Sequence, residues 1–402
     1  TMRKAQFGQS FLAGLVIVVF AIVIDRMSGA LARERKRHDM RVVYAILAAT
    51  AALSLALWTR LPEPSAFGVF AGVAESVDTS LGAFTATYGT TLDSFKNTFG
   101  FFIFLPLRIG LDGAVLPFTW GFQWTAAMSL WFFVAAAAVA GLLAWRGRAL
   151  LGGMVCVLAV IVEIGIAELP WVFVIFGAAA LGYASGGRKM VIFVVAMLGA
   201  VLISGLWERA LLSLYLSGTS VFACAVVGGA IGLASAVSPM VWRVVRPICD
   251  MLQTIPLFVF LIPVLMFFQI GEFSAFLAIC AYAIVPMIRY TQHGLTTTPE
   301  ELLEAATTSG ATEWQTLVEV RAPYAMPTIL LGLNQTILYA FAMLVIAALI
   351  GTTGLGQSIF LALGQADVGL GITAGAAMAI LALVADRLVQ GFADERRRAL
   401  GL

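Results

Sequence analysis

Charged residues are scarce in this chain, and their scarcity excludes a water-soluble fold. Only 11% of the 402 residues are Asp, Glu, Lys or Arg, whereas 61% are hydrophobic. The mean hydropathy is correspondingly high, at +0.98. A soluble domain carries roughly 25% charged residues. Because so few polar side chains cannot cover the surface, we expect the hydrocarbon of a bilayer to be the solvent of this chain.

Cysteine and histidine are also rare, which argues against disulfide, metal and catalytic sites. The cysteines lie in or beside apolar stretches and never at Cys-x-x-Cys spacing, and the histidines are isolated in polar segments. We therefore expect buried thiols, no metal ligands and no catalytic residue. The residues concerned are Cys156, Cys224, Cys249, Cys280, His38 and His293.

A nucleotide-binding loop is missing as well. The nearest approach to a Walker A motif is the segment 182–189, which has Arg188 in place of the lysine and no hydroxyl residue after it. We therefore expect no cofactor on this chain, and any ATP and Mg²⁺ would be bound by a partner subunit.

Long apolar stretches dominate what is present, and a spanning helix needs about 20 mostly apolar residues. We expect about 11 transmembrane helices, although several stretches are short. They lie near 9–24, 42–58, 122–145, 149–167, 171–185, 190–206, 212–236, 256–270, 273–291, 328–350 and 371–387.

The basic residues set the orientation, because cytoplasmic loops carry an excess of Lys and Arg. Eleven spans with the N-terminus outside place every basic cluster and the C-terminus in the cytoplasm. The acidic loops, with Glu63, Glu75 and Glu168, then lie outside. The basic clusters are 26–41, Arg146 with Arg148, Arg188 with Lys189, Arg243 with Arg246, and 387–398.

Two apolar segments could be mistaken for other features. The stretch 95–120 is aromatic and apolar but broken by Pro106, Arg108 and Asp112, so we interpret it as an interfacial segment on the outer face. The N-terminal apolar run resembles a signal peptide, but the charged pair that follows it, Asp25 and Arg26, argues against cleavage.

The N-terminal run also repeats a later one. Residues 13–26 match 374–387 at a constant offset of 361, and both end in Asp-Arg. We interpret segment 1–40 as a helix that copies the last helix of a permease module, so that this chain could be the second part of a tandem permease. The alternative is a coincidence between two helix exits. Segment 41–206 is predicted to be an additional transmembrane region, and 207–398 the permease core.

The polar break at 292–327 carries the strongest signal. Thr298, Pro299 and Glu301 predict a capped helix start, and Gly310 predicts its left-handed end. Thr312 to Gln315 forms a second capping box, after which Pro323 and Pro327 are expected to close the loop before the next span. Two short capped helices around a glycine elbow are typical of a docking element; the alternative is an ordinary solvated connection.

The residue pattern of this loop resembles the EAA motif of ATP-binding-cassette (ABC) importer permeases. The chain departs from that motif at Val320, mildly, and at Ala322, which replaces the usual leucine. The resemblance implies that the loop is a coupling helix seated in a groove of the ATPase subunit. The coupling residues it implies are Glu304, Ala305, Ala306, Gly310, Val320 and Pro323.

A wider stretch, about 207–398, is similar to glycine betaine/proline betaine permeases. The similar segments are 250–256, 284–289, 326–336 and 351–356. The resemblance implies an all-α polytopic membrane protein of the bacterial inner membrane, with a type I ABC importer permease core behind extra N-terminal helices. It implies an osmolyte substrate, such as glycine betaine, proline betaine, choline or trimethylamine N-oxide. The implied partners are two ATP-binding subunits, an extracytoplasmic binding protein and a second permease module, with no nucleic acid.

Several polar and small residues inside the spans remain. Asn334 and Gln335, with Gln253, either bond a neighbouring helix or line the pathway, and helix bonding is favoured for the first two. Glu163 and Asp386 fit interfacial positions better than a proton relay. Glycines four apart, at 228/232 and 371/375, predict close helix packing rather than a gate. Two other functions stay open, an ion-coupled secondary transporter and a membrane scaffold that moves nothing.

Overall fold

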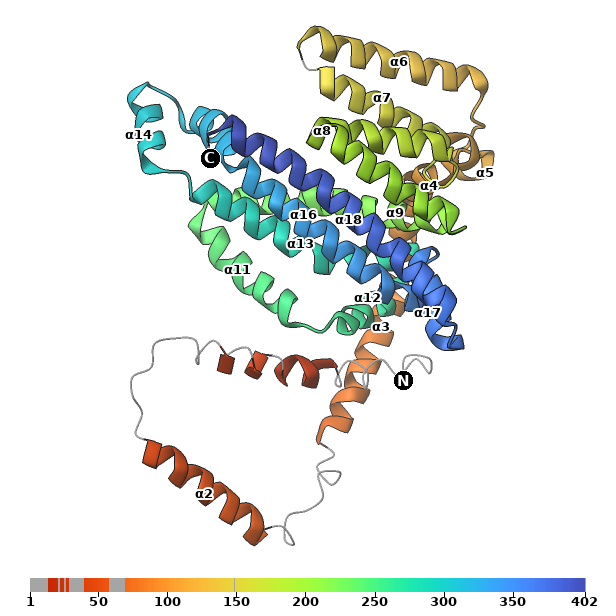
Figure 1. Cartoon of the computed structure of the whole chain (residues 1–402). Coiled ribbons are helices and arrows are strands. Elements are labelled where there is room, and N and C mark those ends of the chain that lie inside the picture. The colour runs from red at the N-terminus through yellow and green to blue at the C-terminus, as the bar shows by residue number, and fades with distance from the viewer. Residues whose placement is uncertain are drawn as a thin grey trace. The chain divides into compact units, whose positions relative to one another are not determined.

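All regular structure in the described part of the chain is helical. The computed structural model describes residues 14–20, 22–24, 27–28, 40–57, 69–147 and 149–401, and no strand occurs within these ranges (Figure 1). The prediction of an all-α protein is therefore confirmed. Two compact units are distinguished, residues 1–89 with 254–266, and residues 90–253 with 267–402.

The smaller unit holds helix α2 (Met40–Leu57), the first part of α3 (Val69–Phe99) and most of α12 (Leu257–Phe268). Gly14 is buried here, and a Cβ atom added to it would lie 3.1 Å from Val259. The Asp25-Arg26 pair and the charged tail of the N-terminal repeat fall outside the described residues, as does most of the basic cluster 26–41, including His38.

The larger unit holds the remaining helices and the candidate sites. Its first half contains η3 (Gly100–Phe104), α4 (Leu105–Ala114), α5 (Pro117–Trp120), α6 (Ala126–Trp145), α7 (Ala149–Ile164), α8 (Trp171–Ile203), α9 (Trp207–Ala223), η4 (Cys224–Gly228), α10 (Gly229–Val237) and α11 (Pro239–Thr254). Its second half contains α13 (Glu272–Thr296), α14 (Glu300–Thr308), α15 (Glu313–Gln315), η5 (Thr316–Arg321), α16 (Ala322–Ala347), η6 (Ala348–Ile350), α17 (Leu355–Gln365) and α18 (Val368–Ala399).

Six described helices are long and apolar enough to cross a bilayer, or seven if the bent pair α11 and α12 forms one span. The predicted count of 11 is thus not confirmed, although the polytopic class is. Part of the difference is length, because the helices at 41–57 and 151–164 are apolar but short. The six are α6, α8, α9 with α10, α13, α15 through η6, and α18.

Helix α8 is a helical hairpin and not one continuous straight helix. Gly187 has non-helical angles, with φ 67° and ψ −156°. A Cβ atom on Gly182 would lie 3.3 Å from the side chain of Val194, whereas residues so far apart in a straight helix are separated by about 18 Å. The chain therefore turns back at Gly187, and its two arms correspond to the predicted spans 171–185 and 190–206.

The centre of the larger unit is the seam between α13 and α16, which run side by side with α18 against α16 (Figure 1). Helix α10 packs against α13. The helices approach closely at small residues. A Cβ atom would lie 2.5 Å from the Cβ of Tyr290 if added at Gly332, and 2.7 Å from the Ile288 carbonyl oxygen if added at Gly232. The packing interpretation of the 228/232 glycines is confirmed. At the second motif, no atom of the described residues lies within 4 Å of a Cβ atom added at Gly375, so Gly375 brings none of the described helices close.

The stretch 95–120, predicted to be an interfacial segment, is mostly helical. Helix α3 continues through the π-helical turn η3 into α4, which breaks at Gly110, with φ 80°. Backbone packing causes this break, because a Cβ atom at Gly110 would lie 2.3 Å from the carbonyl oxygen of Glu163. The Tyr215 hydroxyl donates to the Phe104 carbonyl, at 3.2 Å. The segment is thus fixed to helix α9, and its outer-face location stays a prediction.

Candidate coupling site

The candidate coupling site begins where α13 ends. Helix α14 starts at Glu300, with Pro299 before it and no side-chain cap. The prediction that Thr298 caps this helix is wrong. Thr298 is buried, and its hydroxyl donates to the carbonyl of Leu295 in the last turn of α13, at 3.3 Å. A tertiary position therefore overrides the local capping pattern, and Glu301 lies in the first turn as a carboxylate near the helix N-terminus.

The elbow after α14 has the geometry that its glycine predicts. Gly310 has φ 81°, its N–H donates to the Thr307 carbonyl, and the Ala311 N–H donates to the Ala306 carbonyl, both at 3.0 Å. This pair of bonds is a Schellman motif, which satisfies carbonyls left open at a helix end. No described residue lies within 4 Å of a Cβ atom added at Gly310. The glycine is thus required by the backbone angle alone.

The second capping box is confirmed. The Thr312 N–H donates to the side-chain oxygen of Gln315, at 2.8 Å, and the Gln315 N–H donates to the Thr312 hydroxyl, at 3.3 Å. This box opens a helix that runs without a break from Glu313 to Ile350.

The prediction that Pro323 and Pro327 close a loop is therefore wrong, because both lie inside this helix. The π-helical turn η5 comes just before them, and the Ala322 N–H bonds to the Leu317 carbonyl at its end. Such a turn changes the hydrogen-bonding register of a helix where a proline cannot donate.

The residues of the elbow differ in exposure. Glu304, Ala305, Gly310 and Pro323 are exposed, whereas Ala306 and Val320 are half-buried. Apolar side chains on the two short helices are also exposed. Leu302 of α14 is 42% exposed and Trp314 of α15 is 68% exposed. Exposed large hydrophobic groups next to a free carboxylate fit a surface that a partner covers.

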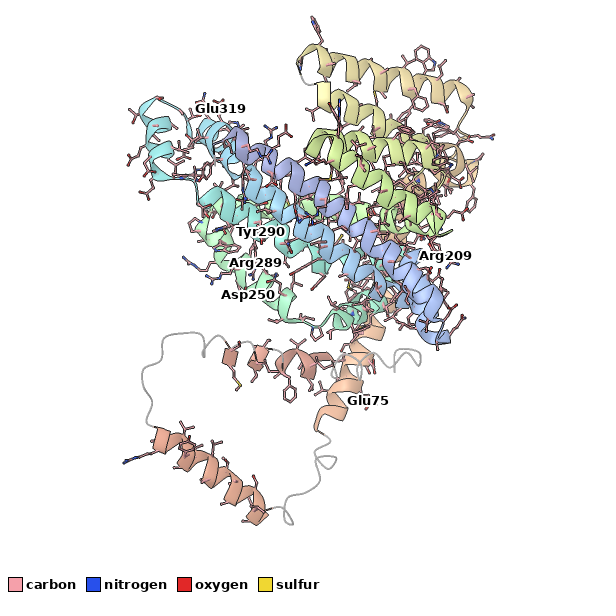
Figure 2. The ribbon with its side chains drawn as sticks, viewed as in Figure 1. Glu75, Arg209, Asp250, Arg289, Tyr290 and Glu319 are labelled. Atoms are coloured by element: carbon pink, nitrogen blue, oxygen red, sulfur yellow. The ribbon has the colours of Figure 1, made fainter. Side chains whose placement is uncertain are left out.

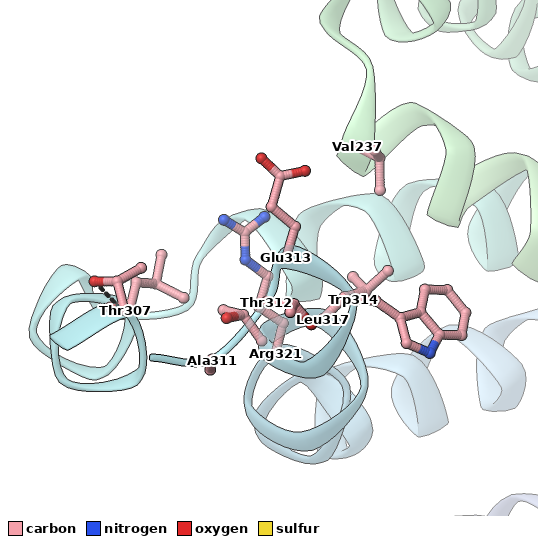
Figure 3. A pocket seen from close by; sticks show the side chains of 10 residues that line it. Val237, Thr307, Ala311, Thr312, Glu313, Trp314, Leu317 and Arg321 are labelled. Atoms are coloured by element: carbon pink, nitrogen blue, oxygen red, sulfur yellow. Dashed lines mark hydrogen bonds between the residues drawn. The ribbon is translucent and has the colours of Figure 1, made fainter. Parts of the chain in front are cut away.

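A cavity of about 730 Å³ lies beside the elbow. It is lined by Leu303 and Thr307 of α14, Trp314 of α15, and Leu317 and Arg321 of η5 (Figure 3). The Arg321 Nε atom is buried and makes no hydrogen bond among the described residues. The hollow between the two short helices is thus open to a side chain from outside this chain.

The polar residues predicted inside the spans take different positions. The Asn334 amide of α16 donates to the Asp386 carboxylate of α18, at 2.6 Å, and the Gln390 amide donates to the same oxygen, at 2.7 Å. This geometry is the inter-helix contact favoured for Asn334. Gln335 is half-buried and Gln253 is exposed, and neither makes a recorded hydrogen bond in the described part.

An ion pair that the sequence reasoning missed connects α11 to α13. Arg289 pairs with Asp250, and the two side chains face each other across these helices (Figure 2). Cys249 packs beside them against Val285 and Ile288. Asp250 and Arg289 both lie in segments that resemble betaine permeases. That resemblance was the only signal in the sequence that could have linked the two residues.

Glu163 is likewise anchored rather than free. The Ser129 hydroxyl and the Trp124 indole N–H both donate to one of its carboxylate oxygens. This contact joins the end of α7 to the start of α6. Within the described ranges, no three His, Cys, Asp or Glu side chains gather.

Comparison with known proteins identifies the core. Residues 226–398, within the predicted permease core, match the family described as binding-protein-dependent transport system inner membrane component. The chain is 37% identical over 235 residues to the glycine betaine transport system permease protein OpuAB of Bacillus subtilis, covering 58% of this chain and 83% of that protein. The chain belongs to this family.

Two further relatives are matched over a smaller share of their own length. The trimethylamine N-oxide transport system permease protein TmoV of Pelagibacter ubique is 37% identical over 236 residues, which are 58% of this chain and 33% of that protein. The glycine betaine/proline betaine transport system permease protein ProW of Escherichia coli is 36% identical over 228 residues, 57% of this chain and 64% of that protein. The chain thus matches a third of one relative and about two thirds of the other.

Proposed function

We propose that this inner membrane component is the translocation subunit of an ABC importer that takes up a small osmolyte. Glycine betaine, proline betaine, choline and trimethylamine N-oxide are the substrates proposed. The names of the three relatives support the glycine betaine and trimethylamine N-oxide assignments. ATP would be hydrolysed by two partner subunits, and a binding protein would deliver the substrate from outside. A second permease module would complete the pathway.

The coupling elbow, which consists of α14, the turn at Gly310 and α15, is the observation that carries this proposal. Helix α14 presents Glu304 to solvent, and the fixed turn at Gly310 joins α14 to the helix that begins at Glu313. That helix continues into α16 and reaches the core seam. A force applied to α14 would therefore act on the packed helices of the core through short, capped connections rather than through a loose loop.

The orientation follows from the basic residues. We propose that the coupling elbow, the α8 turn with Arg188 and Lys189, and the C-terminal Arg396 to Arg398 lie in the cytoplasm. In that orientation the N-terminal ends of α9 and α13 face outward. Single cysteines in the coupling elbow and in 69–95 should react with an impermeant reagent from opposite sides of the membrane.

The test is copurification of the cognate ATPase with two elbow variants. Glu304→Lys replaces attraction with repulsion at a basic contact on the partner, an effect of about 1 kcal/mol at a rim position. Gly310→Val strains the turn by roughly 1–2 kcal/mol. Both variants should insert normally but lose ATPase association and substrate uptake.

Glu208→Lys is the matched control, because Glu208 is an exposed carboxylate at the start of α9, outside the elbow. It should retain the ATPase. Wild-type association in both elbow variants would mean that this segment is only a connector, and loss with Glu208→Lys alone would point to a different docking face.

A further inference from the structure

A second cavity lies at the other end of α13 from the coupling elbow. Helix α13 has 25 residues, which is about 37 Å at the rise of an α-helix. The cavity is about 300 Å³, at the lower end of the size range of ligand pockets. Its walls include Lys96, Asn97, Phe101, Phe104, Glu272 and Phe273. Its residues all belong to the larger unit.

The π-helical turn η3 gives this cavity its form. Gly100 and Gly271 leave space because they carry no side chain, and both line the cavity. The turn is held in place by the Tyr215 hydroxyl, which donates to the Phe104 carbonyl. Phe104 and Phe273 are buried, with ring centroids 6.1 Å apart. The wall is therefore a fixed aromatic surface, and π-helical turns are frequent at functional sites.

The charges around the cavity cancel but remain separated. Glu272 pairs with Arg108, and Lys96 pairs with Asp93 at 2.8 Å. Two positive and two negative groups give no net charge, so the cavity does not favour a simple cation or anion. Glu272 and Lys96 both line it, and each keeps part of its side chain exposed, at 26% and 23%. This arrangement suits a neutral ligand that carries both charges.

Aromatic faces determine which zwitterion fits. A methylated onium group is attracted to the face of an aromatic ring, and a nearby carboxylate adds to the attraction. Phe101, Phe104, Phe273 and Glu272 supply this half of the site. Lys96 supplies an ammonium and Asn97 supplies an amide. Both groups donate hydrogen bonds, which a ligand carboxylate would accept.

We propose that the turn η3 and the N-terminal end of α13 form a binding site for a small zwitterion with a methylated onium and a carboxylate, of the glycine betaine type. This inference rests on the proposed function and deepens it, since it places a substrate site on the permease chain itself. The site would receive the substrate at the outer end before it enters the core.

The test is binding to the full chain in lipid nanodiscs, without the binding protein, measured by calorimetry with three probes. Glycine betaine carries both groups, tetramethylammonium carries only the onium, and 3,3-dimethylbutyrate replaces the nitrogen of glycine betaine by carbon. Glycine betaine should bind best. The carbon isostere should bind at least about fivefold more weakly, because it loses the cation–π attraction.

Two variants and one control locate the site. Phe101→Ala should weaken glycine betaine binding about fivefold. Lys96→Gln should weaken glycine betaine but leave tetramethylammonium binding unchanged. Phe102→Ala is the control: Phe102 is the next residue of the same turn, is 45% exposed, and packs on Trp120, with centroids 4.7 Å apart. It should leave binding unchanged.

Equal effects of Phe101→Ala and Phe102→Ala, or equal binding of glycine betaine and its carbon isostere, would overturn the proposed site. ATP-driven uptake of glycine betaine by the complete assembly separates this failure from a failure of the proposed function. If uptake occurs while the chain alone binds no glycine betaine, the function stands and the site is wrong. If the assembly transports a different class of substrate, the proposed function is wrong, and the proposed site is wrong with it.

Discussion

The core seam and the coupling elbow each depend on a glycine, for opposite physical reasons. In the seam, Gly332 sits in an ordinary helix, but a Cβ atom there would lie 2.5 Å from Tyr290. At the elbow, Gly310 has open space around it, but its φ of 81° excludes most side chains. The seam therefore needs a missing atom, whereas the elbow needs a backbone conformation.

The difference separates stability from coupling. A residue that fills the seam pushes apart the two most closely packed helices, so its effect is on the folded core. A residue that strains the elbow acts on an exposed turn, so its effect is on the direction of α14. Substitutions of the same chemical kind should consequently give opposite outcomes in the two regions.

The largest effect is expected for Gly332→Val. The valine would have to displace Tyr290 in the seam, and we expect a loss of folded, detergent-stable protein that corresponds to about 3 kcal/mol. Thermal unfolding followed by size-exclusion chromatography measures this. Gly141→Val in α6 is the control, because no atom in the described part of the chain lies within 4 Å of a Cβ atom there. Similar unfolding of both variants would contradict the crowded seam.

The elbow glycine should give a graded series. Gly310→Val is expected to destabilise the turn by about 1–2 kcal/mol, and Gly310→Asn by less, because asparagine tolerates the left-handed conformation. ATPase copurification should follow the same order, with Asn close to wild type. Equal behaviour of the two variants would mean that backbone angle is not the requirement at this position.

The capping box at the elbow should contribute less. Thr312→Ala removes the hydroxyl that accepts the Gln315 N–H and is expected to cost about 1 kcal/mol. Thr307→Ala is its control, because the Thr307 hydroxyl donates to carbonyls of its own helix, at 2.9 and 3.1 Å, rather than to a backbone N–H at a helix start. Hydrogen exchange at Gln315 should increase in the first variant only; an increase in both would assign the effect to general loosening.

The smallest stability effect is expected between α16 and α18. Asn334→Leu removes the contact with Asp386 and should lower the unfolding free energy by about 0.6 kcal/mol, the average for such bonds in membranes. Gln335→Leu, at a neighbouring position without a recorded bond, should change stability less. If Gln335→Leu instead lowers substrate uptake without destabilising the protein, Gln335 lines the pathway.

Local sequence signals predicted the elbow well, because its geometry is set by neighbouring residues. Gly310 and the Thr312–Gln315 box act within a few positions of the chain. The same reasoning failed at Thr298, where burial redirects the hydroxyl to Leu295. It also failed at Pro323, because the π-helical turn before it leaves no clear residue pattern.

The remaining features depend on contacts between distant residues. The Asn334–Asp386 bond joins positions 52 apart, and the Arg108–Glu272 pair joins positions 164 apart. Neither pairing can be read from a single sequence, and the cavity at η3 exists only because such segments meet. The α8 hairpin, in contrast, was predicted as two spans because Arg188 and Lys189 separate its arms.

The most direct test of the central proposal is uptake of labelled glycine betaine into proteoliposomes. They would contain this chain with its ATPase subunits and permease partner, with the binding protein on the opposite side from the ATPase. We expect uptake that requires ATP on the ATPase side, survives the collapse of ion gradients and disappears with Gly310→Val. Uptake that follows an ion gradient without ATP, or that persists at wild-type rates in the variant, would contradict the assignment of a coupled importer permease.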